Sequence, residues 1–406
     1  MQAVRETQLG NGSEVTFAFW NVRPDIVVEN AARLAAATGT AVRCIEVSGD
    51  YADWIAAGFA TGQAPMVFSA QRAEASVWDA QGHLAVLDET ALAAALAGMD
   101  ARLVAGARNP AGDLIGLTYY NGGPFALFDH VDHPVPDPAA LTTWAGVLDH
   151  LRRAQWDGMA HPFVPRWHHG QTGLVWSLLS HLASEGVTDL GAANAPAALR
   201  DALTFLRALW HEGLVPPAAI ADQGDVAAVA RWASGQHALT FTMDYLAVDA
   251  ARMAGRPIST PLPRLPGSTG AALMPGHALL CLNAATPPAR RGAAIALLEH
   301  LGGAAVHRRW LTECLFAVPR PDLDNDATVR AAMAHAFPSD DAPASVARLI
   351  TARQGATVSP PTHAPWFLNW SADCDRIVRD GVLRGTLSPD ATAEALLARW
   401  HHLAAR

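Results

Sequence analysis

EVTFAFW, Glu14–Trp20, and the two strand-like runs that follow it decide the fold of this chain. A helical pattern begins at Pro24 and stops at Gly39, and a second β-rich run follows at 41–47. Another helix is expected after a capping Asp50, and APMVFS, residues 64–69, reads as a third strand. Strand–helix–strand–helix–strand before residue 70 predicts βαβ units and a parallel sheet.

The rest of the chain alternates extended, helical and irregular segments. An irregular proline-rich stretch at 256–275 suits a passage between two lobes, and a second irregular segment covers 357–365. Extended segments are expected at 114–120, 125–128, 238–243 and 278–282, and helices at 142–154, 171–185, 197–212, 224–234, 290–301 and 304–314.

Composition excludes several classes of function. The chain has 406 residues, of which 50% are hydrophobic and 17% charged, with a net charge of −9. The length favours two domains, and the negative charge argues against nucleic-acid binding. All 29 basic residues are arginine, so Schiff-base catalysis, a lysine general base and a phosphate-binding loop lysine are excluded.

No catalytic or cofactor motif is present. GxSxG, HExxH and GxGxxG are absent, and we expect no cofactor and no catalytic residue. The four cysteines form no CxxC pair, and buried free thiols are favoured over one disulfide. Histidines gather at 129–133, with His161, His168 and His169 further on; a polar loop is favoured there over a zinc site.

The sequence leaves the cellular compartment open. No segment reads as a membrane span, and the first residues lack the apolar core of a signal peptide. Either the chain is cytoplasmic, with Met1 as its native start, or an export signal has been removed from a periplasmic or extracellular membrane-associated protein.

Several short segments along nearly the whole chain resemble segments of a known family. No segment is specific by itself, and the resemblance rests on their order. They are EVTFAFW, APMVFS, Gly116-Leu-Thr-Tyr-Tyr120, Phe125-Ala-Leu-Phe128, Thr143-Trp144, the stretch 232–239, Pro261-Leu-Pro263 and Phe316-Ala-Val-Pro319. The order resembles the family 1 extracellular solute-binding proteins, the sugar-binding subunits of ABC importers, a group that includes maltose-binding protein. The chain departs from that pattern at Thr118, Asp129, His130 and Gln236.

The resemblance implies an α/β, two-lobed periplasmic-binding-protein-like fold of type II, with a ligand cleft between the lobes. Lobe one would be 1–115 plus 258–315, and the helix-rich lobe two 116–257 plus 316–406. Hinge closure would capture the ligand, because a ligand that contacts both lobes favours the closed form.

Aromatic and polar residues at the expected ends of strands are the candidate ligand-binding residues. Sugars present apolar C–H faces and hydroxyl groups, which aromatic rings and planar polar side chains bind. The chain has 13 Trp and 4 Tyr. The alternative is core packing for Trp20, a structural contact between the lobes for Tyr120 and an exposed loop for the segment that begins at Arg166. The candidates are Trp20, Ser69, Tyr119, Tyr120, Asn121, Arg166, Trp167, Asp244, Tyr245, His277 and Trp366.

Two hypotheses of function follow. The first is a non-catalytic, monomeric protein that captures a carbohydrate and delivers it to the permease subunits of an ABC transporter, with no metal and no nucleic-acid partner. The alternative is a cytoplasmic protein that keeps the two-lobed fold but serves as an enzyme or as a pathway-specific binding partner.

Overall fold

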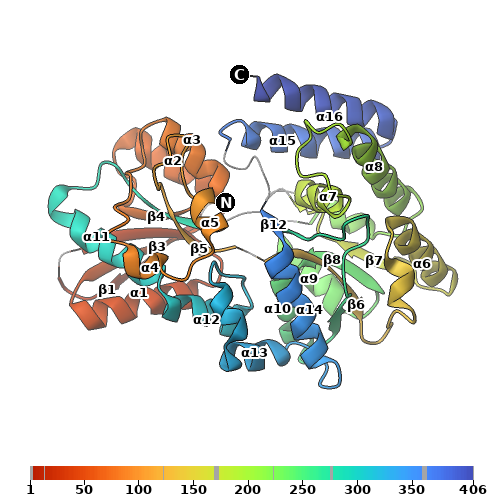
Figure 1. Ribbon diagram of the computed structural model, residues 1–406, viewed down its shortest axis with the longest axis horizontal. Helices are drawn as coiled ribbons and strands as arrows, with labels where there is room; N and C mark the ends of the chain where they lie inside the picture. Colours follow the sequence, from red (N-terminus) through yellow and green to blue (C-terminus); the bar gives the residue numbers. More distant parts are fainter. Residues whose placement is uncertain are drawn as a thin grey trace.

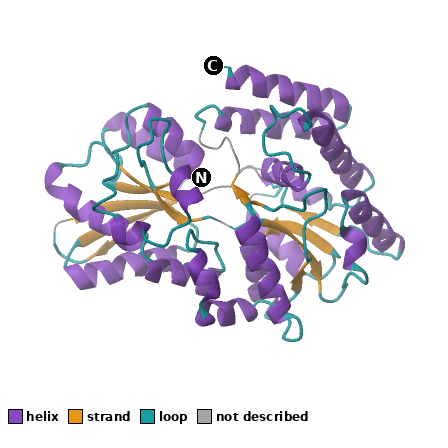
Figure 2. Ribbon diagram, in the orientation of Figure 1, coloured by secondary structure: helices purple, strands orange, loops and turns teal. Residues whose placement is uncertain are grey.

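The computed structural model describes residues 3–12, 14–121, 123–168, 173–222, 224–274, 278–358 and 364–405. Two α/β lobes lie side by side, each with a sheet in its interior and helices packed around it (Figures 1 and 2). Each lobe is organised around its own hydrophobic core. No helix within the described ranges is long and apolar enough to cross a membrane.

The first lobe is built on a six-stranded sheet in the order β1-β3-β2-β4-β11-β5. Strands β2, β3 and β4 are parallel, whereas β11 runs antiparallel to both β4 and β5. The carboxyl ends of β2, β4 and β5 therefore lie at one edge of the sheet. The strands are β1 (Ala3–Leu9), β2 (Glu14–Trp20), β3 (Ala41–Ser48), β4 (Val67–Gln71), β5 (Leu117–Tyr120) and β11 (Ala278–Leu282).

Both faces of this sheet are covered, which explains why β2 is apolar along nearly its whole length. Val15, Phe17, Ala18 and Phe19 are all buried. Helix α1 starts with a proline in its first turn and ends at Gly39, whose φ of 72° suits glycine. The helices are α1 (Pro24–Thr38), α2 (Tyr51–Thr61), α3 (Arg72–Ala80), α4 (Ala93–Leu96), α5 (Ala101–Gly106), α11 (Pro288–Leu301) and α12 (Ala304–Cys314).

The second lobe holds a four-stranded sheet in the order β7-β8-β6-β9. Its strands are β6 (Phe125–His130), β7 (Phe163–Pro165), β8 (Leu239–Met243) and β9 (Ser259–Pro261). The short strands β10 (Leu273–Met274) and β12 (Thr357–Val358) pair separately.

Most of the helices belong to this lobe. The α-helices are α6 (Trp144–Trp156), α7 (Gly173–Ser184), α8 (Ala195–His211), α9 (Asp225–Ala233), α10 (Asp244–Ala254), α13 (Ala327–Ala334), α14 (Ala342–Gly355), α15 (Phe367–Val378) and α16 (Pro389–Ala404). The shorter turns are η1 (Pro138–Leu141), η2 (Pro217–Ile220), η3 (Pro321–Asn325) and the π-helical η4 (Arg379–Leu383).

The chain passes between the lobes three times: between β5 and β6, between β10 and β11, and between α12 and α13. Strand β5 pairs within the first sheet, although we expected lobe two to begin at 116. Strand β9 pairs within the second sheet and Leu273 packs in the second core, so 258–274 belongs to lobe two and not, as expected, to lobe one. The first and third crossings are joined directly, because the Asn121 N–H donates to the Ala317 carbonyl at 2.7 Å.

Most of the predicted elements agree with the structure, but several observed elements were not predicted, among them β1, β7, β9, α3 and α5. The strands at 41–47 and 278–282 and the helices from 142 to 234 and from 290 to 314 are confirmed, with ends that differ by a few residues. Strand β1 was not predicted. It pairs antiparallel with β3 at the edge of the sheet, and most of its side chains are exposed, so it lacks an apolar pattern.

Candidate functional site

In both sheets, the edge that lies near the crossings is formed by the carboxyl ends of parallel strands. The first crossing leads from the carboxyl end of β5 directly into β6, and β6 is antiparallel to β8. Strand β7 is parallel to β8. The carboxyl ends of β2 and β5 in one lobe and of β7 and β8 in the other therefore face the region between the lobes. In α/β proteins this edge is the usual position of a ligand site.

A row of aromatic rings runs from the first lobe to the second. Trp20, at the end of β2, packs edge-on against Tyr51 and donates its Nε1–H to the Tyr120 hydroxyl at 2.6 Å. Tyr120 contacts Phe316 in the third crossing at 4.9 Å between ring centroids. Phe316 stacks on Tyr245 at 4.3 Å, with 24° between the ring planes. We call Tyr51, Trp20, Tyr120, Phe316 and Tyr245 the aromatic row.

Two rings of this row, one in each lobe, are less buried than the rings between them. Trp20 and Tyr245 are half-buried, whereas Tyr120 and Phe316 are buried. Tyr245 packs against the hydrophobic cores of both lobes, as does Val318. The row therefore links the lobes, and one of its residues in each lobe keeps part of its surface exposed.

A buried polar cluster lies next to Tyr245 in the second lobe. Arg166 follows β7 and donates from Nε to Asp225 Oδ1 at 2.6 Å, and His168 Nε2 lies 2.8 Å from the same oxygen. The Tyr245 hydroxyl donates to Asp225 Oδ2 at 3.5 Å. Burial by itself would raise the pKa of Asp225, but Arg166 and His168 hold it well below its usual value, so the carboxylate stays ionised.

Arg166 keeps a donor that has no partner among the described residues. The residue is 4% exposed, and its Nη1 is buried without a hydrogen bond. Buried polar atoms are nearly always paired, so an unpaired guanidinium nitrogen at this position suits an oxygen acceptor supplied by a ligand.

Asp244, at the start of α10, is placed differently from what the sequence suggested. Its side chain is fully buried, and Oδ2 accepts from Arg353 Nε at 2.8 Å. Arg353 also donates to the Leu315 carbonyl in the third crossing. The carboxylate that we expected to face sugar hydroxyls thus faces a guanidinium and ties α10 to α14.

The remaining predicted residues do not join the aromatic row. Tyr119 lies in the first core against Trp310, and Trp167 lies in the second core. Ser69 is buried in β4, and Asn121 is buried between the crossings. Trp366 is half-buried and packs edge-on against Trp400. His277 falls outside the described residues.

Sequence reasoning did not select three residues of the site: Tyr51, Phe316 and Asp225. Phe316 directly follows the expected lobe boundary at 315, so an aromatic residue at that boundary was an available signal. Asp225 had none, because it lies 59 residues from Arg166.

The structure offers no metal centre in the ranges it describes. No group of three or more His, Cys, Asp or Glu side chains there could hold a metal ion. Asp129 and His130 are buried in strand β6, so the polar loop that we expected at 129–133 is wrong for these two residues. His130 Nδ1 accepts from the Asp132 N–H just beyond the strand. All four cysteines are buried and free, as predicted.

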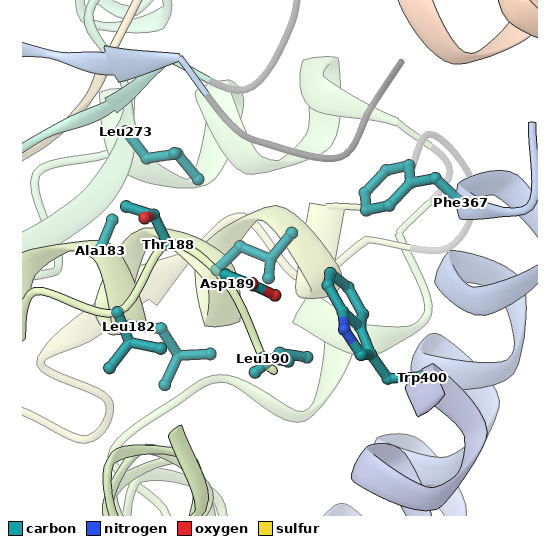
Figure 3. Close-up of a pocket in the computed structure, with 10 residues that line it drawn as sticks. Leu182, Ala183, Thr188, Asp189, Leu190, Leu273, Phe367 and Trp400 are labelled. Atoms are coloured by element: carbon teal, nitrogen blue, oxygen red, sulfur yellow. The ribbon is translucent and has the colours of Figure 1, made fainter. Parts of the chain in front are cut away.

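Two pockets away from the aromatic row differ strongly in size. A cavity of about 10 Å³ in the second lobe is lined mainly by apolar side chains, among them Leu182, Leu273, Phe367 and Trp400 (Figure 3). It has room for little more than one water molecule. A surface groove of about 480 Å³ runs between α10, α12 and α13.

No protein-family model and no curated protein sequence matches this chain. Solved structures do match over nearly its whole length. Maltose-bound MalE3 of T. maritima has 17% identity and a TM-score of 0.77, covering 97% of this chain and 100% of that chain. The GacH receptor of Streptomyces glaucescens GLA.O, solved without ligand and with acarbose, gives the same identity and TM-score, with coverages of 97% and 99%.

An ABC transporter solute-binding protein from Thermotoga lettingae TMO, bound to α-D-tagatose, has 16% identity and a TM-score of 0.77, with coverages of 97% and 100%. Similarity at this level of identity shows a shared fold. The chain has the two-lobed periplasmic-binding-protein-like fold, and the predicted fold class is confirmed.

Proposed function

We propose that this protein is a non-catalytic carbohydrate-binding protein that closes its two lobes on a sugar or oligosaccharide and delivers it to an ABC transporter. The aromatic row, which is continuous from Trp20 in one lobe to Tyr245 in the other, is the observation that carries the proposal. The similar solved structures support it, since those proteins are bound to maltose, acarbose and tagatose.

Trp20 and Tyr245 would form the two stacking surfaces. An aromatic ring packs favourably on the apolar C–H face of a pyranose, and both rings keep part of their surface uncovered. Because the rings belong to different lobes, a sugar that touches both would stabilise the closed arrangement over the open one. Closure thus follows from binding without any chemical step.

Arg166 would bind ligand oxygen through its unpaired Nη1. Asp225 holds the guanidinium through Nε and Nη2, so Asp225 and His168 are positioning residues in this proposal. We assign Asp244 a positioning role at the hinge, because its carboxylate bonds to Arg353.

Tyr120 would support Trp20 through their hydrogen bond. Direct ligand contacts by Ser69, Tyr119, Asn121, Trp167, His277 and Trp366 stay predictions from the sequence. The proposal also includes a monomer that works outside the cytoplasmic membrane, where an ABC importer receives its substrate.

Thermal unfolding with a panel of maltose, maltotriose, acarbose, tagatose and chitin oligosaccharides tests the proposal. A ligand that binds only the folded state stabilises it by about 2.7 kcal/mol at 100 times its Kd, so one class of sugar should raise the Tm. The sugar should be recovered chemically unchanged after prolonged incubation. A panel without any Tm shift, or a sugar that is turned over, would contradict the proposal.

Substitutions in the row locate the site. Trp20→Ala and Tyr245→Ala should each weaken sugar binding by roughly ten-fold or more, since a lost stacking contact of about 1.5 kcal/mol corresponds to that factor. Trp156→Ala is the matched control, because Trp156 is 92% exposed and lies in α6. Equal affinity in all three variants would show that the sugar binds elsewhere.

A further inference from the structure

A third pocket, of about 350 Å³, lies between the lobes beside the crossings. Leu103 of α5 lines it from the first lobe, and Arg353 of α14 lines it from the second. Asn121 and Ala317, which follow Tyr120 and Phe316 in the chain, supply the crossing segments. None of the rings of the aromatic row lines this pocket, so it is a separate space from the proposed sugar site.

Two buried polar atoms of the pocket residues have no hydrogen-bond partner in the part of the chain that the structure describes. Arg353 uses Nε for Asp244 and Nη2 for the Leu315 carbonyl, and its Nη1 is unpaired. Asn121 donates its backbone N–H to Ala317, while its side-chain Oδ1 is unpaired. Arg353 is 6% and Asn121 2% exposed, so water satisfies these atoms poorly. Two residues that line the pocket therefore each keep one unpaired buried group, a cationic donor on Arg353 and a neutral acceptor on Asn121.

A carboxylate adds a second acceptor. Asp324 is 7% exposed and accepts from Gln354 Nε2 at 3.5 Å, which is long for a hydrogen bond to a carboxylate. Burial raises the pKa of Asp324, and the positive charge of Arg353 offsets only part of this effect, because the carboxylate forms no ion pair within the described ranges. By contrast, the pocket's other acid, Asp100, already pairs with Arg102 at 2.7 Å.

We propose that this pocket binds a small zwitterion of the α-amino-acid type. Its carboxylate would accept from Arg353 Nη1, and its ammonium group would donate to Asp324 and to Asn121 Oδ1. Its side chain would pack on the apolar part of the lining, which is formed by Leu103, Val318, Pro321 and Ala356. An α-amino acid is the simplest molecule that carries a carboxylate and an ammonium group on one carbon atom.

Binding here would be coupled to the position of the lobes. The lining comes from both lobes and from two crossings, and Arg353 also holds the third crossing through Leu315. A molecule that fits the pocket in one lobe arrangement better than in another shifts the balance between them. By linkage, an amino acid would then change the sugar affinity, and the sugar would change the amino-acid affinity by the same factor.

Calorimetric titration of the intact protein with the common amino acids tests this site. We expect at least one amino acid to bind, while acetate, ethylamine and glycerol, which supply one charge or none, do not. Asp324→Asn should weaken binding about ten-fold or more, because it removes a charge-assisted hydrogen bond. Asp322→Asn is the matched control: it makes the same change in the same turn, at an exposed residue.

Ala356→Leu, which fills part of the pocket, gives a second test that keeps every charge. It should abolish amino-acid binding, with circular dichroism to confirm that the variant is folded. The absence of any amino-acid binding would overturn the proposal, and so would equal losses in Asp324→Asn and Asp322→Asn.

Separate titrations distinguish this proposal from the carbohydrate function. Asp324→Asn should still bind the sugar. If an amino acid instead bound at full strength to Asp324→Asn but not to Trp20→Ala, it would be a ligand of the aromatic row. That result would overturn both the proposed amino-acid site and the carbohydrate function, whereas sugar binding without amino-acid binding would overturn only the amino-acid site.

Discussion

Asp244 and Arg353 form an ion pair that is almost completely shielded from water, with side-chain exposures of 0% and 4%. Taking two charges out of water costs free energy, and their attraction offsets that cost only while both are present. The pair joins the first turn of α10 to the last turn of α14. We therefore interpret it as a fixed structural bond at the hinge.

Asp244→Asn should lower the free energy of unfolding by about 3–5 kcal/mol, because it leaves a buried, unpaired guanidinium. Chemical denaturation measures this change. The control is Asp380→Asn, whose carboxylate pairs with Arg384 at the surface and should contribute less than about 1 kcal/mol. Similar losses in both variants would mean that the buried pair has no special role.

His181 predicts a dependence of stability on pH. It is buried and stacks on Trp144 at 4.2 Å between ring centroids, and burial lowers its pKa to about 3. The unfolded chain binds the proton at a pKa of about 6.5, so protonation favours the unfolded state below that pH. Stability should fall as pH decreases from about 6.5, by about 2 kcal/mol at pH 5 from this residue.

His181→Phe keeps an aromatic ring against Trp144 and removes the titrating group. Urea denaturation at pH 7 and pH 5 should show a smaller loss of stability in this variant than in the parent protein. His402→Phe, a change at an exposed position of α16, is the control and should retain the parent pH dependence. An unchanged pH dependence in His181→Phe would contradict the assignment.

At the scale of elements, the first crossing is shaped by Gly123. Its φ is 86°, which L side chains rarely adopt, and a Cβ there would overlap Asp244 Oδ1. The crossing thus passes directly over the buried ion pair. Only a glycine permits both the backbone conformation and the close approach.

Gly123→Ala should destabilise the protein by roughly 3 kcal/mol or more, because strain and steric overlap add at one position. Gly62→Ala separates the two effects. Gly62 has a φ of 69°, but a Cβ added there would meet no described atom within 4 Å, so only the strain of about 1–2 kcal/mol applies. Thermal unfolding of both variants measures these effects. Equal losses of stability in Gly123→Ala and Gly62→Ala would contradict the interpretation.

Local patterns predicted most elements because their signals are short-range. Strand β2 has buried side chains on both faces, and α1 is bounded by Pro24 and Gly39. Strand β1 shows where this approach fails: AVRETQL is mostly exposed, and only its pairing with β3 makes it a strand.

At the scale of the whole molecule, two separately organised cores are joined by three crossings. Such an arrangement allows the lobes to move as bodies while their interiors stay packed. The aromatic row spans the lobes through the third crossing, so a ligand that contacts both Trp20 and Tyr245 would act on both bodies at once.

Small-angle X-ray scattering should therefore show a smaller radius of gyration when a sugar identified by the Tm panel is added. Trp20→Ala should not contract at the same sugar concentration, because one of the two stacking surfaces is missing. A sugar that raises the Tm of the parent protein without any contraction would argue against hinge closure.

The sequence predicted the fold class and the order of most strands and helices, and it selected Trp20, Tyr120, Arg166 and Tyr245 as candidates for a ligand site. It did so because strand ends and helix caps leave local patterns, and these residues lie at strand ends. The tertiary structure decided the rest. The bonds from Arg166 to Asp225 and from Arg353 to Asp244 join residues 59 and 109 positions apart, and no local periodicity records such pairs. The role of Asp244 therefore followed only from its folded surroundings: its partner, and not its place after a strand, defines what its carboxylate does.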